Sequence, residues 1–346
     1  MKTKSKLNYF IKTIKDKQVL KAGLGYTIGN FLIKGISFLT LPIFTRVLTT
    51  SDFGLYNTFM AYESFFVILI SFGVYMSIKA AMIEYEKNID EYISNIITYV
   101  IIVFFVFLGI LFLLEGVFQN LFEFNRILMV LMLLQSASTS VITIYNIKLS
   151  MDYSYKNYLL ISLTLAMSSV IISLILIFSI FADAKYYGRI LGSALPSIMI
   201  AIYIIYLTYK KKLPSWNKEH LSFALKYSLP LVPHGISQIV LAQADRIMIL
   251  KIIGSIEAGL YSFAYNIGVI LQILSTSLDT VWGPWFFKNY KAGNFIDIKK
   301  RSSQYITLFS FITVMLLLMS PEFIKVLGSQ EYRQTTEVVI PVLLAT

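Results

Sequence analysis

The sequence contains no cysteine, and only two of its 346 residues are histidine. The lack of cysteine excludes disulfide bonds and thiolate metal sites. A histidine metal site is not expected either, because one of the two histidines, His220, lies in a basic stretch. The sequence therefore predicts no metal centre, and no cofactor or catalytic residue is assigned to it.

Charged residues are scarce as well. They make up 14% of the chain, whereas 57% of its residues are hydrophobic and its mean hydropathy is +0.70. A soluble domain has about 25% charged residues and is less hydrophobic. The composition predicts an integral membrane protein. No cleavable signal peptide is expected, because no small-residue cleavage site precedes the first long apolar run.

Nine apolar runs are long enough to cross a bilayer as helices, which takes about 18 residues or more. Two of them contain one charge each, Lys34 in 22–45 and Glu63 in 55–78. The other seven are 92–114, 127–147, 157–182, 190–209, 227–244, 260–278 and 302–320. A tenth run begins at Val338 and reaches Thr346. We therefore predict an all-α polytopic membrane protein with nine full spans and part of a tenth.

Lysine and arginine are unevenly divided between the two sides of these spans. Of the 30 such residues, 21 fall in loops on the side of the N-terminus and 7 in loops on the other side. Because cytoplasmic loops carry the positive excess, the N-terminus is predicted to be cytoplasmic. The net charge of +11 predicts contact with anionic lipids and gives no support to nucleic-acid binding. Residues 1–21 are expected to form a short helix on the membrane surface or a disordered basic tail.

One short motif occurs twice. Gly54-Leu55-Tyr56 recurs 205 residues later as Gly259-Leu260-Tyr261, and in the same register Arg46 falls on Lys251. If this is not a chance recurrence, the first and seventh spans are equivalent, and the chain forms two parallel six-helix lobes around a central cavity. The predicted parts are a basic segment 1–21, a lobe 22–212, a cytoplasmic linker 213–226 and an incomplete second lobe 227–346.

Lys34 lies at the middle of the first apolar run, roughly 17 Å from either end by helix rise. Its side chain is too short to reach the membrane surface. An ammonium group in lipid costs about 3 kcal/mol or more, so intramembrane charges usually mark a pathway or a cavity. The alternative is that Lys34 pairs with Glu63 inside the helix packing.

Polar residues form a stripe on the predicted first and seventh spans. On a helix, those of the first span fall within a sector of roughly 80°. They are Thr27, Asn30, Lys34, Ser37 and Thr45 in the first span, and His234, Ser237, Gln238 and Asp245 in the seventh, with Arg246 beside them. We expect the two stripes to face each other across a hydrated cleft. The alternative is internal pairing, for example of Asp245 with Arg246.

His234 follows Pro230 and Pro233, whose missing N–H groups leave backbone carbonyls free. Two roles stay open for this histidine. It hydrogen-bonds to those carbonyls, or it contacts the substrate or takes up a proton.

Six segments together resemble the bacterial oligosaccharide flippases of the multidrug/oligosaccharidyl-lipid/polysaccharide exporter superfamily. They are 41–46 (Leu-Pro-Ile-Phe-Thr-Arg), 52–56 (Asp-Phe-Gly-Leu-Tyr), 229–235 (Leu-Pro-Leu-Val-Pro-His-Gly), 245–249 (Asp-Arg-Ile-Met-Ile), 258–261 (Ala-Gly-Leu-Tyr) and 282–285 (Trp-Gly-Pro-Trp). The resemblance implies alternating access that moves an undecaprenyl-pyrophosphate-linked glycan outward across the bacterial cytoplasmic membrane. Such proteins usually have twelve or more spans, so this sequence is expected to be a fragment or a truncated product.

The expected substrate contacts are the cations for the pyrophosphate and neutral polar groups for the glycan. They are Lys34, Arg246, Arg46, Lys251, Asn30, Ser37, His234 and Gln238. Glu63, Asp245 and Asp279 are the candidates for ion coupling. The expected partners are the lipid-linked oligosaccharide, anionic membrane lipids and polysaccharide assembly enzymes.

Two other functions compete with the flippase. A multidrug exporter for organic cations would need carboxylates to dominate its cavity, which Lys34 and Arg246 argue against. A membrane glycan polymerase or ligase would need acid–base residues on a sizeable outer loop. Most of the predicted outer loops have about a dozen residues or fewer, so we expect a transporter rather than an enzyme.

Overall fold

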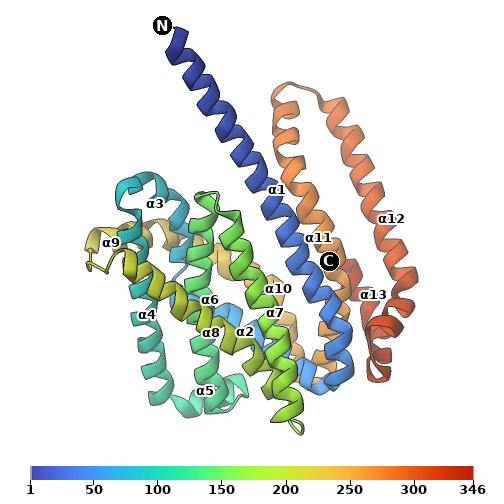
Figure 1. The fold of residues 1–346 in the computed structure, drawn as a ribbon. Coiled ribbons are helices and arrows are strands. Elements are labelled where there is room, and N and C mark those ends of the chain that lie inside the picture. Colours follow the sequence, from blue (N-terminus) through green and yellow to red (C-terminus); the bar gives the residue numbers. More distant parts are fainter. Residues whose placement is uncertain (1, 346) are drawn as a thin grey trace. The chain divides into compact units, whose positions relative to one another are not determined.

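In a computed structural model that describes residues 2–345, the chain is helical and the described residues include no strand. The side chains of 2–20, 24, 276, 277, 279–281 and 284 lie outside the described part. Figure 1 labels the α-helices in chain order. They are α1 (Lys2–Val47), α2 (Thr50–Ser71), α3 (Ile78–Glu84), α4 (Ile89–Leu113), α5 (Glu115–Phe122), α6 (Arg126–Met151), α7 (Tyr155–Ser179), α8 (Lys185–Lys211), α9 (Lys218–Ser228), α10 (Val232–Ile252), α11 (Ser255–Lys291), α12 (Phe295–Leu327) and α13 (Thr335–Ala345). The 3-10 turns are η1 (Val74–Ser77), η2 (Glu86–Asn88), η3 (Leu229–Leu231) and η4 (Gln330–Gln334).

Within the described residues, eight helices are long and apolar enough to cross a membrane. They are Lys21–Val47, Thr50–Ser71, Glu86–Leu113, Arg126–Met151, Tyr155–Ser179, Lys185–Lys211, Ser255–Ser275 and Phe295–Leu327. Each overlaps a run predicted from the sequence. The protein is therefore a multi-pass all-α membrane protein, as predicted.

The predicted seventh span, 227–244, is not among these eight helices. Its chain turns through η3, which contains Pro230, and the helix restarts as α10 at Val232. Helix α10 continues beyond the predicted run into a charged stretch that includes Arg246 and Lys251. Its crossing of the membrane stays a prediction. The predicted tenth run corresponds to α13.

The basic segment 1–21 is continuous in backbone with the first span. Helix α1 runs without a break from Lys2 to Val47. The two alternatives expected for this segment, a helix on the membrane surface and a disordered basic tail, both stay predictions.

The chain divides into two compact units. The first unit contains residues 1–37 and 59–245, and the second contains 38–58 and 246–346. Three helices pass from one unit to the other, namely α1, α2 and α10. The lobe boundaries expected from the sequence, 22–212 and 227–346, stay a prediction.

Glycines bring helices of the first unit close together. A β-carbon on Gly188 or Gly192 of α8 would lie within 3.0 Å of the backbone of Ile177 or Ser173 of α7. Small residues four apart let membrane helices approach in this way. The packing of α7 on α8 therefore depends on the absence of side chains at these two positions.

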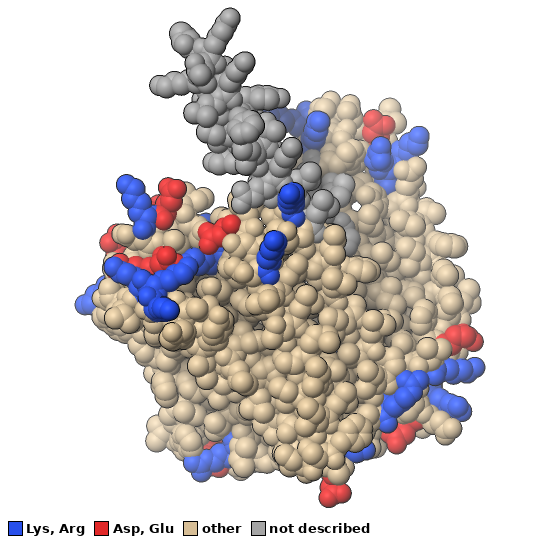
Figure 2. All heavy atoms as spheres, viewed as in Figure 1, with Lys and Arg blue, Asp and Glu red and all other residues tan. Residues whose placement is uncertain are grey.

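Charged side chains are sparse on the face shown in Figure 2, which is mostly uncharged. A group of them lies over α3 and α9 of the first unit. Exposed lysines and glutamates of this part include Lys79, Glu84, Lys87, Lys210, Lys211, Lys212, Lys218 and Glu219. This group of charges lies at the ends of apolar helices, and its location on the cytoplasmic side stays a prediction.

A buried asparagine holds the linker between α8 and α9 against α4. The Asn95 side-chain oxygen accepts hydrogen bonds from the backbone N–H groups of Ser215 (2.8 Å) and Trp216 (3.2 Å). Its amide nitrogen lies 2.9 Å from Nδ1 of His220 and 3.2 Å from the Ser215 hydroxyl. Because an amide nitrogen only donates, Nδ1 of His220 accepts, and the ring proton lies on Nε2. We call this set of contacts the linker clasp.

Replacing Asn95 by alanine is expected to release the linker. The backbone N–H groups of the exposed residues Ser215 and Trp216 would lose their acceptor, which costs about 1 kcal/mol for each hydrogen bond. Trypsin should then cleave faster after Lys212, next to the released loop. As a control, Asn88→Ala removes an exposed asparagine that makes no side-chain capping bond. Equal cleavage of the Asn95 and Asn88 variants would contradict the role of the clasp.

The linker clasp is also expected to weaken in acid. Burial lowers the pKa of His220, and the smaller effect of Glu91 and Glu219 opposes this. The folded protein therefore resists protonation of His220, so stability is lost as the pH falls below the unfolded value of about 6.5. The melting temperature of the wild type should fall more between about pH 7.5 and about pH 5.5 than that of His220→Gln. Equal losses would contradict this assignment.

Candidate functional site

Lys34 lies on the face of α1 opposite its packing contact with α7. A β-carbon on Gly25 or Gly29 would clash with Tyr155 or Leu159, so the glycine face of α1 packs on α7. Lys34 follows Gly29 by five residues, which places it about 140° further round the helix. Its side chain is exposed. In the described part of the chain it makes no ion pair or hydrogen bond, so the predicted alternative of pairing with Glu63 is not found there.

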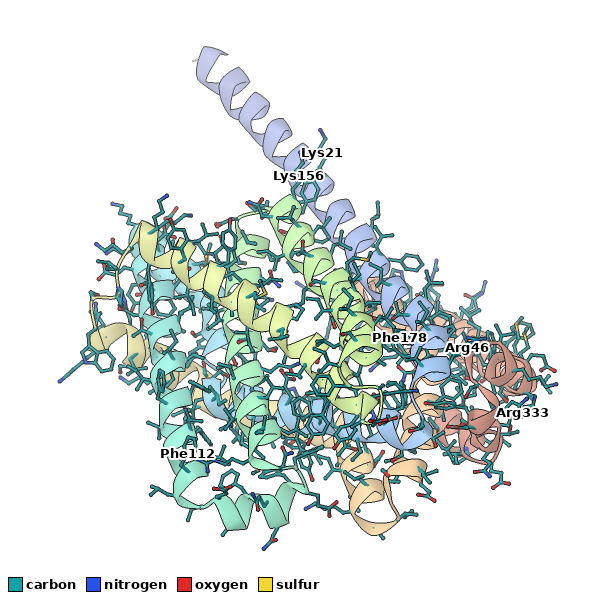
Figure 3. The ribbon with its side chains drawn as sticks, turned by 60° about the horizontal axis from the view of Figure 1, so that its bottom comes forward. Lys21, Arg46, Phe112, Lys156, Phe178 and Arg333 are labelled. Atoms are coloured by element: carbon teal, nitrogen blue, oxygen red, sulfur yellow. The ribbon has the colours of Figure 1, made fainter. Side chains whose placement is uncertain are left out.

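Figure 3 shows that Lys21 of α1 and Lys156 of α7 lie at the same end of this helix pair, whereas Phe178 lies at the other end of α7. Both lysines belong to the loops predicted to be cytoplasmic. Lys34 lies about 20 Å along α1 from Lys21 by helix rise. The geometry of the first unit thus keeps Lys34 far from the basic end of α1.

The other polar residues of α1 lie next to Lys34 on the first unit. Asn30 is exposed, and its side-chain oxygen accepts a hydrogen bond from the Tyr158 hydroxyl at 2.9 Å. The hydroxyls of Thr27 and Ser37 donate to backbone carbonyls one turn earlier, at 2.9 and 3.2 Å. The Thr27 hydroxyl, bonded back in this way, keeps acceptor lone pairs for an outside donor. Tyr158 was not singled out from the sequence, because its contact with Asn30 joins residues 128 positions apart.

The first part of α10 also belongs to the first unit and presents a polar face. Gly235 packs on Ile68 at 3.0 Å and on Met76 at 3.1 Å, measured from the position of a β-carbon. His234 and Gln238 are exposed. The five predicted contacts Asn30, Lys34, Ser37, His234 and Gln238 therefore all lie in the first unit.

The structure bears on the two roles considered for His234. The Pro233 carbonyl accepts a hydrogen bond from the Ser237 hydroxyl at 2.8 Å. His234 itself makes no hydrogen bond to any residue that the structure describes. A hydrogen bond from His234 to the freed carbonyls is therefore not found in that part, and its contact with substrate stays a prediction.

Arg246 is the buried cation of the second unit. Its side chain is 9% exposed, and its guanidinium group lies 4.4 Å from the centre of the Tyr265 ring on α11. A cation over an aromatic face gains electrostatic attraction, more so when it is desolvated. The sequence identified Arg246 by its charge but did not identify Tyr265, which is one of 23 tyrosines.

Arg46 and Lys251, the pair matched by the repeat, have different surroundings in the second unit. The Arg46 guanidinium donates to the Pro42 carbonyl at 2.7 Å and to the Val326 carbonyl of α12 at 2.8 Å. It therefore binds the carbonyl end of a helix, where a cation is stabilising. Lys251 is exposed in the last turn of α10. Substrate contact stays a prediction for both residues.

Of the ion-coupling candidates, Glu63 is buried in the first unit. It is 5% exposed, and one carboxylate oxygen accepts a hydrogen bond from the Thr139 hydroxyl of α6 at 2.7 Å. No cation pairs with it among the described side chains. Asp245 is exposed at the boundary between the units. The Asp279 side chain lies outside the described residues, and ion coupling stays a prediction for all three.

Comparisons with known proteins identify the family of the chain. A family described as "Polysaccharide biosynthesis protein" matches residues 19–290. The chain belongs to this family. The matched region contains both polar stripes and all predicted substrate contacts. It confirms the resemblance to polysaccharide flippases that the short motifs predicted.

A protein from Haemophilus influenzae is similar to this chain. It is named "Lsg locus putative protein 1" and is 23% identical over 332 residues, which cover 90% of this chain and 78% of the relative. No solved structure is significantly similar to the chain.

Proposed function

We propose that the protein moves an undecaprenyl-pyrophosphate-linked oligosaccharide from the inner to the outer leaflet of the bacterial cytoplasmic membrane by alternating access. The family, polysaccharide biosynthesis protein, supports a role in making a surface glycan. The eight apolar helices support a role within the membrane. In this proposal the protein is a transporter and not an enzyme, and its N-terminus is cytoplasmic.

The observation that carries the proposal is the state of Lys34. It lies in the middle of an apolar helix, its side chain is exposed, and no partner for it exists in the described part of the chain. A pyrophosphate cannot cross hydrocarbon unaided, because its charges lose their hydration. A mid-membrane ammonium group offsets this loss through charge-assisted hydrogen bonds.

Neutral polar groups of the first unit fit the glycan part of the substrate. Asn30 already accepts one hydroxyl hydrogen bond, from Tyr158, and the amide groups of Asn30 and Gln238 are exposed in the same unit. Sugar hydroxyls both donate and accept, as these amides do. Arg246 in the second unit is the second proposed pyrophosphate contact, and the polyprenyl chain stays in lipid.

The two competing functions are less well supported. An organic-cation exporter would need carboxylates to dominate its cavity, but Glu63 is buried and bonded to Thr139, and the exposed charge in the middle of α1 is the cation Lys34. A glycan polymerase would need acid–base residues outside the membrane. The interhelical loops at Leu48–Thr49 and Ile253–Gly254 are only two residues long, which leaves no room for such a site there.

Deleting the gene in the bacterium that carries it tests the proposal. Surface polysaccharide should be lost. Lipid-linked repeat units should accumulate in the inner leaflet, where reagents inside the cell reach them and reagents outside do not. Restoring the gene should reverse both changes. Loss of a polymerase would instead leave single repeat units on the cell surface, and that result would overturn the proposal.

A further inference from the structure

Helix α8 of the first unit presents a stripe of exposed side chains whose chemistry changes along the helix. Met199, Tyr203, Tyr206 and Lys210 are exposed and lie three or four residues apart. Residues at these spacings share one face of a helix. The stripe runs from an apolar side chain through two aromatic rings to a cation in the last turn. This order is typical of a helix that passes from hydrocarbon into the headgroup region.

Two cations at the end of this stripe have no anionic partner. Lys210 and Lys211 are exposed, and neither makes an ion pair in the part of the chain that the structure describes. The Lys210 ammonium group lies 6.0 Å from the centre of the Tyr206 ring. Lys212 differs, because its ammonium group lies 3.4 Å from a carboxylate oxygen of Glu91. Two positive charges are therefore available to an external anion.

The linker after α8 exposes a tryptophan in a strained backbone conformation. Trp216 is 62% exposed, whereas Trp282 and Trp285 are half-buried. Its φ of 53° lies in the left-handed region, which is unfavourable for a bulky residue. Asn95 of the linker clasp holds this turn, since its side-chain oxygen accepts the Trp216 N–H at 3.2 Å. Strain that the surrounding structure maintains is characteristic of functional positions.

The side chains of residues 210–216 together match the chemistry of a phospholipid. Ammonium groups bind phosphate oxygens through charge-assisted hydrogen bonds. An indole ring suits the membrane interface, because its body is apolar and its N–H donates. Leu213, between the lysines and Trp216, is also exposed and adds an apolar contact. A soluble anion would use the lysines alone, so the exposed leucine and tryptophan favour a lipid.

We propose that Lys210, Lys211, Leu213 and Trp216 bind the headgroup of an anionic phospholipid. We call these four residues the linker anchor. The lysines bind the phosphate, and the leucine and indole side chains contact the glycerol and the start of the acyl chains. The net charge of the chain predicts only diffuse attraction of anionic lipids to every basic loop, whereas the linker anchor is one defined site. It does not depend on the proposed function.

Thermal unfolding of the purified chain in detergent tests the linker anchor. Added phosphatidylglycerol should raise the unfolding midpoint by several degrees more than phosphatidylcholine does, because a ligand that binds only the folded state stabilises it. The Lys210→Gln/Lys211→Gln variant should lose most of this difference. No difference between the two lipids with the wild type would overturn the proposal.

The matched control is Lys79→Gln/Lys87→Gln. It removes the same charge from two exposed lysines of the same unit, which lie close in sequence to the exposed Glu84 and Glu86. This variant should keep the response to phosphatidylglycerol. An equal loss of the response in both double variants would show diffuse attraction and would also overturn the linker anchor.

The Trp216→Gly variant separates lipid binding from folding. Glycine adopts a φ of 53° without strain, so the unfolding midpoint without lipid should not fall. The extra stabilisation by phosphatidylglycerol should nevertheless be lost, because the indole contact is absent. A full response of this variant to phosphatidylglycerol would contradict the assignment of Trp216 to the site.

Fluorescence quenching in vesicles identifies the source of the anion. The signal of Trp216 is the difference between the wild type and Trp216→Phe. Brominated phosphatidylglycerol should quench it more than brominated phosphatidylcholine at the same mole fraction. Inorganic pyrophosphate in the buffer should leave this preference unchanged, since it lacks the acyl chains that Leu213 contacts. Equal quenching by the two lipids, or loss of the preference with pyrophosphate, would overturn the lipid site, and the second result would indicate a site for soluble anions.

Discussion

Replacing Lys34 by alanine reduces polysaccharide export about tenfold or more at unchanged protein level. Hydrogen bonds to a charged group contribute about 1.5–3 kcal/mol, and each 1.4 kcal/mol changes affinity tenfold. Lys34 has no partner in the part of the chain that the structure describes, so its removal leaves no buried group unsatisfied there. Export is measured as surface polysaccharide in a strain that lacks the chromosomal copy.

Two variants control this experiment. Lys34→Arg keeps the positive charge and should retain most of the export. Lys79→Ala removes an exposed lysine outside the eight apolar helices and should export normally. Normal export by Lys34→Ala would remove the residue from the pathway.

Replacing Gly192 by valine is expected to destabilise the first unit by about 1–3 kcal/mol. A β-carbon at this position would lie within 3.0 Å of the backbone of Ser173 on α7, and backbone cannot move aside as a flexible side chain can. The protein level and the thermal unfolding midpoint in detergent should both fall.

The matched control is Gly109→Val on α4. Nothing lies within 4 Å of a β-carbon at Gly109, so this variant makes the same change in helix propensity without the clash. Similar unfolding midpoints for the two variants would show that α7 and α8 tolerate a larger separation than the structure indicates.

The helices of this protein could be predicted because bilayer thickness imposes a minimum length on apolar runs. The predicted run 127–147 lies within α6 (Arg126–Met151), and the predicted 157–182 largely coincides with α7 (Tyr155–Ser179). The run 227–244 differs, because prolines interrupt it and α10 starts five residues later. Hydropathy reports whether a segment is apolar, not where its helix begins.

Single residues of the candidate site could be predicted where their charge conflicts with their surroundings. Lys34 and Arg246 were identified in this way. Tyr265 could not be, because its contact with Arg246 depends on how α10 packs on α11. The linker clasp was missed for a similar reason, since the Asn95 and His220 side chains meet across 125 residues of sequence.

The repeat shows what pattern and structure each contribute. Sequence spacing predicted that Gly54 and Gly259 are equivalent. It could not predict their contact, in which a β-carbon on Gly54 would lie 2.7 Å from the backbone nitrogen of Gly259. Arg46 and Lys251 correspond in the same register, yet only Arg46 binds the carbonyl of Val326. Equivalence of position therefore does not imply equivalence of role.

The most direct test of the account is translocation by the purified protein in liposomes. An undecaprenyl-pyrophosphate-linked oligosaccharide is placed in one leaflet, and a membrane-impermeant glycosidase reports its arrival in the other. The account predicts rapid arrival with the wild-type protein and a rate reduced about tenfold or more with Lys34→Ala. Two results would contradict the account. One is a translocation rate with wild-type protein that equals the rate in protein-free vesicles, and the other is an equal rate for the wild type and Lys34→Ala.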